Sequence, residues 1–438
     1  MERIQIREVQ EHIGKKVTIA GFAQTIRAQG SISFLLIRDI SGVIQAVITK
    51  DKEEATKAVS ELSLESVVEI TGTAKKEKQA PGGFEIAVEE VKILSQAEPE
   101  LPIPIVEKGD DGEVDQPIRL DWRWLDLRKP KNTLIFKVWT VLEEAFREYL
   151  VKKGYIEIHS PKLISTASES GAEVFEVKYF ERKAYLAQSP QFYKQMAMAA
   201  GFEKVFEVGP VFRAEPSFTS RHSTEFTGYD LEISYIDSHE DVMEEEEKLL
   251  RHMLEKVKEA YGEEIKETFG REVVVPKAPF PKLSMKETKE ILKKLGVPSE
   301  KEGDLSPEEE RKVSEYVMKK EGHEFVFITD YPVDVRPFYH MRYENEPSLT
   351  KSFDLLWNGL EITTGAQREH RYDVLVKQAE EKKMDLKALE FYLNFFKYGC
   401  PPHGGLGAGP NRMLMQLLGL ENIRDASFVY RGVKRLEP

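Results

Sequence analysis

The sequence predicts an α+β protein with two parts: a small Greek-key β-barrel at the N-terminus, then a larger domain in which helices flank an antiparallel sheet. In the first hundred residues, short β-rich runs alternate with glycine-bearing turns, which is typical of small barrels. Farther along, long amphipathic helices are interspersed with apolar strands. The chain has 438 residues, more than one hydrophobic core usually holds, so two or three domains are expected.

The barrel is expected to occupy residues 1–100. Its predicted strands are residues 16–21, 33–39, 43–49, 67–73 and 84–94. The stretch that follows is rich in proline and acidic residues and has neither helical nor strand periodicity. We therefore predict a linker over 101–133 and a second domain over 134–438.

The second domain opens with a predicted helix at 134–153, where apolar side chains recur at helical spacing. Gly154 ends this helix, and a short strand is predicted at 155–158. Residues 240–330 are rich in Lys and Glu and predict a helical insertion. Within it, the acidic run 244–247 is expected to be a solvated face without chemistry. Further strands are predicted at 324–329, 352–356 and 360–363, with a helix at 385–398.

Composition narrows the function classes. No apolar segment approaches the length of a membrane span and no leader follows the N-terminal Met, so a soluble cytoplasmic protein is expected. The single cysteine, Cys400, excludes an internal disulfide and a cysteine-rich zinc cluster. The net charge is −13, and residues 1–100 also carry an acidic excess. Any contact with nucleic acid is therefore expected to come from local patches.

A nucleotide site is predicted from two distant segments. In the first, Arg213 and Arg221 offer fork-shaped donors to phosphate oxygens. In the same segment, Phe226 offers a flat face to a purine and Glu215 an acceptor for its edge. In the second, the glycine-rich run 404–409 leads into Arg412. No Gly-x-x-x-x-Gly-Lys-Ser/Thr motif occurs, so the pattern indicates a site that activates a carboxylate with ATP without a P-loop.

These segments resemble motifs of the class II aminoacyl-tRNA synthetases. Residues 211–226 resemble motif 2, the run from Gly405 to Arg412 resembles motif 3, and the helix, strand and proline at 134–161 resemble motif 1. With residues 186–195, 365–370 and 399–405, the likeness narrows to aspartyl-tRNA synthetases of the archaeal and eukaryotic type and covers nearly the whole chain. The resemblance implies an OB-fold anticodon-binding barrel, a class II catalytic domain and a homodimer formed through motif 1. For that last segment, an ordinary helix and strand is the alternative.

The resemblance also implies an aspartate site. Lys194 and Arg368 match the cations that hold the side-chain carboxylate, and Gln191 and Asp230 match residues that face the amino group. Glu169 and Glu173 match a mobile loop over the amino acid, with Ser170 where the family usually has Gly. Arg213, Thr364 and His403 complete the expected aspartate contacts.

Divalent metal is expected because ATP is strongly anionic. Asp354, Glu361 and Thr364 supply hard oxygen ligands that suit Mg²⁺, and Glu361 also counts among the expected ATP contacts. The metal-free alternative is that the two acids are paired with basic neighbours. No spacing supports zinc, so His222 and His403 are interpreted as substrate contacts.

The implied reaction has two steps. The α-carboxylate of aspartate attacks ATP, giving aspartyl-adenylate and pyrophosphate, and a terminal ribose hydroxyl of tRNA then takes the aspartyl group. Arg213 is expected on the α-phosphate, while Arg221, His222 and Arg412 hold the ATP tail and adenine. Catalysis would be positioning and charge compensation, without a side-chain nucleophile.

Five barrel residues match anticodon-contacting positions of the resembled family. Phe34 would stack a base, and Gln45 and Glu85 would bond base edges; the alternative for Phe34 is a barrel-core aromatic. Gln24 and Pro81 stand where enzymes restricted to aspartate tRNA tend to have Trp and Lys. This suggests a non-discriminating enzyme that also charges asparagine tRNA and needs an amidotransferase partner.

Two positions depart from the resembled family. Asn411 stands where motif 3 has Glu, and Gly432 lies where an acidic residue is usual, so slower catalysis or a greater need for Mg²⁺ is expected. Three alternatives stay open: an asparaginyl-tRNA synthetase, a paralogue that makes asparagine, and a tRNA-binding or regulatory protein on a decayed scaffold. The asparagine-making paralogue would lack the barrel.

Overall fold

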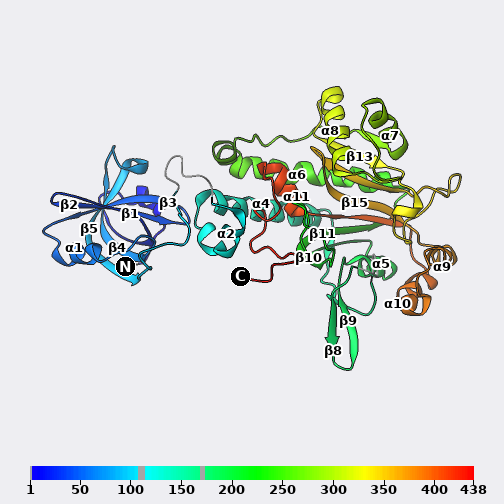
Figure 1. The fold of residues 1–438 in the computed structure, drawn as a ribbon, viewed down its shortest axis with the longest axis horizontal. Helices are drawn as coiled ribbons and strands as arrows, with labels where there is room; N and C mark the ends of the chain where they lie inside the picture. Colours follow the sequence, from blue (N-terminus) through cyan, green and yellow to red (C-terminus); the bar gives the residue numbers. More distant parts are fainter. Residues whose placement is uncertain (1, 107–113, 168–172) are drawn as a thin grey trace. The chain divides into compact units, whose positions relative to one another are not determined.

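The structure is a computed structural model that describes residues 2–106, 114–167 and 173–438. It consists of two compact units, Met1–Lys129 and Pro130–Pro438 (Figure 1). The expected linker over 101–133 contains two short helices, α2 (Gln116–Asp121) and α3 (Arg123–Asp126), and both belong to the first unit. In the described ranges, none of the helices combines the length and apolar character needed to cross a bilayer.

The first unit contains a closed barrel with the strand order β1-β2-β3-β5-β4. Its elements are the 3₁₀ helices η1 (Ile6–His12) and η2 (Pro81–Gly83), the strands β1 (Lys16–Gln29), β2 (Ile32–Asp39), β3 (Gly42–Thr49), β4 (Val67–Lys76) and β5 (Phe84–Ser95), and helix α1 (Glu53–Ser60). Alternate residues such as Leu35 and Ile37 fill the interior. The predicted barrel and its strands are confirmed, whereas α1 was not predicted because it is short.

The second unit is built on one mixed sheet with the strand order β12-β13-β14-β15-β16-β11-β10-β6. Its strands are β6 (Ile156–Glu157), β10 (Lys204–Phe212), β11 (Glu225–Ser234), β12 (Lys282–Ser284), β13 (Phe325–Thr329), β14 (Ser352–Trp357), β15 (Leu360–Arg368) and β16 (His403–Ala408). A separate small sheet is formed by β7 (Leu163–Ile164), β8 (Glu176–Tyr179) and β9 (Arg182–Leu186). Pairing is antiparallel except where β6 meets β10 and β12 meets β13.

Helices flank this sheet, as the sequence predicts (Figure 1). They are α4 (Pro130–Lys152), α5 (Gln191–Ala199), α6 (His239–Phe269), α7 (Met285–Lys294), α8 (Pro307–Glu321), α9 (Tyr372–Glu381), α10 (Leu386–Lys397) and α11 (Pro410–Leu418), with the 3₁₀ helix η3 (Val333–Val335). The segment 240–330 is largely helical, but it also supplies β12 and β13 to the main sheet. It is therefore more than a surface insertion.

One row of paired residues crosses the centre of the main sheet. Asp230 on β11 pairs with Gly407 on β16, Gly407 pairs with Thr364 on β15, and Thr364 pairs with Asp354 on β14. Because side chains alternate along a strand, these four positions share one face of the sheet. Helix α6 packs on the opposite face, since a Cβ added at Gly404 would approach the side chain of Val242. The row thus brings polar residues from distant parts of the chain to one surface.

The acidic run 244–247 is only partly solvated. Glu246 and Glu247 on α6 are buried, 2% and 7% exposed, so the prediction of a solvated face is wrong for them. Both carboxyl oxygens of Glu246 lack hydrogen-bond partners among the described residues. Burial raises the pKa of Glu246 to about 8, because the charged form loses its hydration.

Glu246 is expected to make stability fall as pH rises from about 4.5 to 8. In this window the folded protein keeps the proton that the unfolded chain has released, so each pH unit costs about 1.4 kcal/mol. Glu246→Gln should remove this loss and raise stability at pH 8 by a few kcal/mol. Urea unfolding at pH 5 and pH 8 measures the difference. The exposed Glu244, paired with Lys248, provides the matched control, Glu244→Gln. An identical pH slope in wild type and Glu246→Gln would contradict the assignment.

Candidate active site

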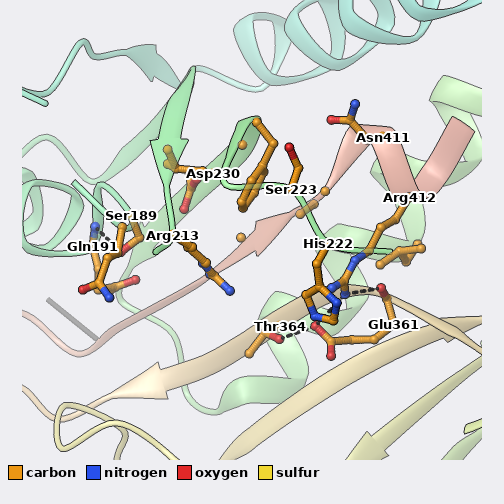
Figure 2. Close-up of a pocket in the computed structure, with 18 of the residues that line it drawn as sticks. Ser189, Gln191, Arg213, His222, Ser223, Asp230, Glu361, Thr364, Asn411 and Arg412 are labelled. Carbon is orange, nitrogen blue, oxygen red and sulfur yellow. Dashed lines mark hydrogen bonds and ion pairs between the residues drawn. The ribbon is translucent and has the colours of Figure 1, made fainter. Parts of the chain in front are cut away.

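A cavity of about 340 Å³ opens on the polar face of the main sheet. This volume is within the range of small-molecule sites. Most residues predicted from the sequence line it, namely Gln191, Arg213, Glu215, Arg221, His222, Phe226, Asp230, Glu361, Thr364, Arg368 and Arg412. Figure 2 shows Gln191 and Ser189 at one end, and His222, Glu361 and Arg412 together at the other. The site therefore has two ends of different chemistry.

Four residues predicted for the site do not line the cavity, namely Lys194, Asp354, His403 and Glu173. The first three are buried. Glu169 lies outside the described residues. The backbone carbonyl of Glu173, from the same predicted loop, accepts hydrogen bonds from Gln188 Nε2 (3.2 Å) and Ala214 N (3.0 Å).

Lys194 is 1% exposed and already has partners. Its Nζ donates to Asp230 Oδ1 (2.8 Å) and to the carbonyl of Leu406 (3.0 Å). Direct contact of Lys194 with a bound carboxylate stays a prediction, and it would require Nζ to share or leave these partners. Its partner Asp230, in contrast, lines the cavity. Burial raises the pKa of Asp230, and the ion pair with Lys194 offsets this only in part.

Glu232 is the main residue that the sequence reasoning missed. It is completely buried on β11, its Oε1 accepts from Arg368 Nε (3.0 Å), and its Oε2 lies 3.4 Å from Lys194 Nζ. Burial alone would raise the pKa of Glu232, but Arg368 and Lys194 outweigh it, so the pKa lies below its usual value. One signal was available: Asp230 and Glu232 are acidic residues two apart on an apolar strand, hence on one face.

Arg368 presents its guanidinium to the cavity from a fixed position. Nη2 donates to the carbonyl of Gly405 (3.0 Å) and Nη1 donates to His340 Nε2 (2.9 Å). Because arginine has only donors, His340 must accept at Nε2 and carry its proton on Nδ1. Burial, followed by the nearby Arg368, lowers the pKa of His340 well below its usual value, so the ring is neutral. His340 also lines the cavity and was not predicted.

His403 supports the site from behind. It is completely buried; Gln195 Nε2 donates to its Nε2 (3.0 Å), and its Nδ1 donates to the carbonyl of Pro401 (2.8 Å). Gln191 Nε2, at the cavity wall, donates to Gln195 Oε1 (3.1 Å). Burial lowers the pKa of His403 to about 4. In this structure a chain of hydrogen bonds through Gln195 links His403 to Gln191 at the cavity wall, and a direct contact of His403 with substrate stays a prediction.

The other end of the cavity has oxygen ligands and cations. Thr364 Oγ1 donates to Glu361 Oε1 (3.2 Å), and Arg412 Nη1 donates to the Glu361 carbonyl (2.9 Å) (Figure 2). Asp354 is not part of this group: its Oδ2 accepts from Arg336 Nη2 (2.6 Å). Among the described residues, no three His, Cys, Asp or Glu side chains gather as a metal site. The expected set consists of two carboxylates and one hydroxyl, and its binding of Mg²⁺ through Asp354, Glu361 and Thr364 stays a prediction.

Arg336 is a further cavity-lining cation that the sequence reasoning missed. Its guanidinium lies 3.6 Å from the ring centre of Tyr331, and its pairing with Asp354 is almost fully buried. Burial raises the pKa of Asp354, and Arg336 opposes this rise. This ion pair is the contact that the metal-free alternative expects for Asp354, and a role for Asp354 in binding Mg²⁺ stays a prediction.

The loop that carries Arg221 and His222 is tied to helix α8. Arg221 Nη1 donates to Glu310 Oε2 (2.5 Å), and Glu310 is 5% exposed. Burial raises the pKa of Glu310 to about 7 despite the arginine. His222 is deprived of hydration and lies near Arg412, which lowers its pKa. Arg213 is exposed at the cavity, with its guanidinium 5.7 Å from the ring centre of Phe226.

The two departures from the resembled family have structural counterparts. Asn411 Nδ2 donates to the carbonyl of Ala426 (2.9 Å), a role that a carboxylate cannot fill. A Cβ at Gly432 would lie 2.5 Å from the Tyr430 hydroxyl. Acidic residues at these two positions would therefore disturb existing contacts, while slower catalysis or a greater need for Mg²⁺ stays a prediction.

The barrel places three of its five predicted residues on one outer face. Leu36 pairs with Gln45 and Gln45 with Glu85, while Phe34 is two residues before Leu36, on the same face and outside the core. Gln45 Nε2 donates to Glu85 Oε2 (2.9 Å). Phe34 is therefore not a barrel-core aromatic, and the role of this face in reading bases stays a prediction.

The remaining two barrel residues lie elsewhere. Gln24 is at a bulge in β1, where its Oε1 accepts from Arg38 Nη1 (3.2 Å). Pro81 is exposed at the start of η2, before β5.

Two protein families match the chain. Residues 115–429 match the family described as tRNA synthetases class II (D, K and N), and residues 17–94 match the OB-fold nucleic acid binding domain. The chain is 45% identical over 438 residues to the aspartate–tRNA(Asp/Asn) ligase of Aeropyrum pernix, covering 97% of this chain and 96% of the relative. It is 42% identical to the aspartate–tRNA(Asp) ligase of Pyrococcus abyssi, covering 98% of each.

Solved structures of two related enzymes match the fold. Asparaginyl-tRNA synthetase from Pyrococcus horikoshii, complexed with asparaginyl-adenylate, aligns with a TM-score of 0.92 at 36% identity over 100% of both chains. Aspartyl-tRNA synthetase from Entamoeba histolytica aligns with a TM-score of 0.88 at 33% identity, covering 100% of this chain and 93% of that one.

Gly405→Ala should destabilise the protein by about 3 kcal/mol or more, because the new Cβ would lie 2.1 Å from the Leu231 carbonyl and 2.2 Å from Glu232 Oε2. Gly409→Ala is the matched control: the nearest atoms lie 3.8 Å away, on the side chain of Arg412, so a change within about 1 kcal/mol is expected. Urea unfolding curves of both variants measure the difference. Equal losses would show that Glu232 and β16 can rearrange freely.

Proposed function

The chain belongs to the class II tRNA synthetases of the aspartate, lysine and asparagine group, and on this basis we propose that it is an ATP-dependent aspartate–tRNA ligase. It activates L-aspartate as aspartyl-adenylate and transfers the aspartyl group to tRNA. The observation that carries the aspartate assignment is Arg368, a donor-only side chain fixed at the amino-acid end of the cavity by Glu232, His340 and Gly405.

The amino-acid end is proposed to recognise aspartate by hydrogen-bond polarity. Arg368 offers N–H groups to the side-chain carboxylate, which accepts at both oxygens. Asp230, with Gln191 beside it, faces the cavity and suits the ammonium group. Lys194 acts through Asp230 and Glu232 rather than by direct contact, because its Nζ is buried against them.

The other end is proposed to hold ATP. Arg213 lies over the face of Phe226 and is assigned to the α-phosphate, while the aromatic ring packs on adenine. Arg221 and Arg412 would take the phosphate tail, with Glu215 and His222 beside them in the cavity. The α-carboxylate of aspartate then attacks the α-phosphorus and pyrophosphate leaves. Since no side chain forms a bond, the rate depends on alignment and on compensation of the phosphate charge.

Glu361 and Thr364 are the residues that would hold Mg²⁺. Their oxygens lie 3.2 Å apart at the cavity wall, and Mg²⁺ needs few protein ligands because it keeps several waters. When bound, Mg²⁺ would neutralise phosphate charge near the leaving pyrophosphate. Asp354, which pairs with Thr364 across the sheet, would be the third ligand: its Oδ2 accepts from Arg336, and its Oδ1 has no hydrogen-bond partner among the described residues.

Pyrophosphate exchange into ATP should depend on aspartate and be much weaker with asparagine. An amide NH₂ would place donors against the donors of Arg368, and such a mismatch costs several kcal/mol in a buried site. Measuring exchange with each amino acid tests the assignment. Equal exchange with asparagine, or faster exchange, would favour an asparaginyl-tRNA synthetase, and none with either would favour a decayed scaffold.

Within the same assay, Arg213→Ala should abolish exchange without unfolding the protein. Arg371→Ala removes an arginine that is paired with Glu369 outside the cavity, and should leave exchange near the wild-type level. Circular dichroism of both variants checks that they fold.

The barrel is proposed to bind the anticodon loop, and we infer that the enzyme accepts both aspartate and asparagine tRNA. Support comes from Gln24 and Pro81, neither of which offers a bulky or charged group to reject the asparagine anticodon. Named relatives include an Asp/Asn enzyme and an Asp-specific one, both at similar identity. If both tRNAs are charged, an amidotransferase must convert the misacylated product.

We also infer a homodimer formed through motif 1. Ile156 on the edge strand β6 is 49% exposed, and Val151 at the end of α4 is 60% exposed, so this edge offers an apolar surface. Cytoplasmic localisation is part of the same proposal, as is usual for translation enzymes.

Transcripts of the two tRNAs should be aspartylated with kcat/KM values within about tenfold of each other. A mismatched base lowers the binding free energy by about 1–3 kcal/mol only when a protein residue contacts that base. The double variant Gln24→Trp with Pro81→Lys should lower charging of the asparagine transcript more than that of the aspartate transcript. Pro81→Ala is the control. A wild-type preference of a hundredfold or more for the aspartate transcript would show that other barrel residues discriminate.

A further inference from the structure

The segment after α11 holds the loop that carries Arg221 and His222. We use the name ATP loop for residues 220–224 and C-terminal clamp for Ile423, Tyr430 and Arg431. The amide of Ile423 donates to the carbonyl of Ser220 (2.8 Å), and the carbonyl of Arg431 accepts from Thr224 N (3.1 Å). The clamp therefore fixes both ends of the ATP loop through the backbone.

Tyr430 adds the contact at the middle of the loop. Its hydroxyl donates to the carbonyl of His222 (3.2 Å), and Ser223 Oγ donates to the carbonyl of the neighbouring Arg431 (2.9 Å). The Tyr430 side chain is 6% exposed, and the Arg424 guanidinium lies 5.1 Å from its ring centre. The ring is thus held on one side while its hydroxyl meets the loop.

Gly432 makes this arrangement possible. An added Cβ would lie 2.5 Å from the Tyr430 hydroxyl, 2.6 Å from Cε1 and 2.7 Å from Cζ, so any larger residue would push the ring away. The tyrosine at 430 can therefore adopt this position only because residue 432 has no side chain. Asn411 reinforces it, since Nδ2 donates to the carbonyl of Ala426 within the same segment.

We propose that Tyr430 is a positioning residue for ATP: its hydroxyl fixes the His222 carbonyl, and so directs Arg221 and His222 toward the nucleotide. The proposal rests on the assignment of this cavity end to ATP. It accounts for Gly432 as room made for Tyr430 rather than as a loss of function. It also predicts a selective effect, because Tyr430 touches the ATP loop and not the residues of the amino-acid end.

The test uses the full-length protein and aspartate-dependent pyrophosphate exchange. Tyr430→Phe removes one hydrogen bond and keeps the ring, and should raise the KM for ATP about threefold to tenfold. The KM for aspartate should stay within twofold. Tyr343→Phe is the matched control: it removes a hydroxyl that donates to Asp330 Oδ1 (2.6 Å) outside the cavity, and should leave both KM values unchanged.

Gly432→Ala provides an independent arm. It should raise the KM for ATP to a similar degree, and it should add nothing to that KM in a Tyr430→Phe background, because the hydrogen bond is already absent. Its steric cost should still lower the unfolding temperature in both backgrounds. Additive effects on the KM for ATP would overturn the link between the two residues.

The outcomes separate this proposal from the functional one. An unchanged KM for ATP in Tyr430→Phe overturns the proposal, as does a parallel rise in both KM values with a lower unfolding temperature. If the wild type exchanges no pyrophosphate, the functional assignment fails, and calorimetric titration of Mg·ATP into wild type and Tyr430→Phe then decides the role of Tyr430. A threefold or greater loss of affinity in the variant supports it, and equal affinity, or no binding by the wild type, overturns it.

Discussion

Glu232 is completely buried on β11 and shares its charge between Lys194 and Arg368. Two cations and one carboxylate in a water-poor interior are stable only as a unit, because removing one partner leaves another charge without compensation. The arrangement fixes the direction of Arg368 and, through Lys194, the position of Asp230. Arg368 and Asp230, the two residues proposed to hold the amino acid, thus depend on a buried carboxylate that does not itself line the cavity. The bare backbone of Gly405 leaves the space that Glu232 needs.

The sheet explains why one cavity holds two kinds of chemistry. Strand β16 lies between β11 and β15 and contributes Gly405 and Gly407 to the polar face. Glu232 occupies the space over Gly405, whereas Gly407 lines the cavity. Acceptors and cations for an amino acid lie toward Asp230 and Arg368, while Glu361, Thr364 and Arg412 gather at the other end. A reactant carboxylate and a phosphate can then meet over the glycine strand. The geometry suits a reaction in which the protein aligns partners rather than bonding to them.

The sequence predicted what depends on local pattern. Barrel strands and the long helix α4 follow from periodicity, and most ATP-site residues lie in one short segment, 213–226, or beside the glycine strand. The sequence did not predict contacts that depend on pairing between residues far apart in the chain. His340 is brought to the cavity by an isolated β-bridge with Arg368. Lys194 and His403 are buried because they hydrogen-bond to buried residues, Asp230 and Gln195. Glu246 was misread because the pattern of a charged helix face does not reveal which side covers a sheet.

The guanidinium of Arg221 forms an ion pair with the carboxylate of Glu310. An arginine without a partner samples many rotamers and is hydrated, so binding a phosphate would cost it side-chain entropy and hydration. Here the Arg221 side chain is 19% exposed and held by Glu310, so much of that entropic and hydration cost is met during folding. Burial raises the pKa of Glu310 to about 7 even beside Arg221, so the charged form of this carboxyl group is disfavoured here. If the cavity binds ATP as proposed, a triphosphate with several negative charges would compete well for Arg221 against such a partner.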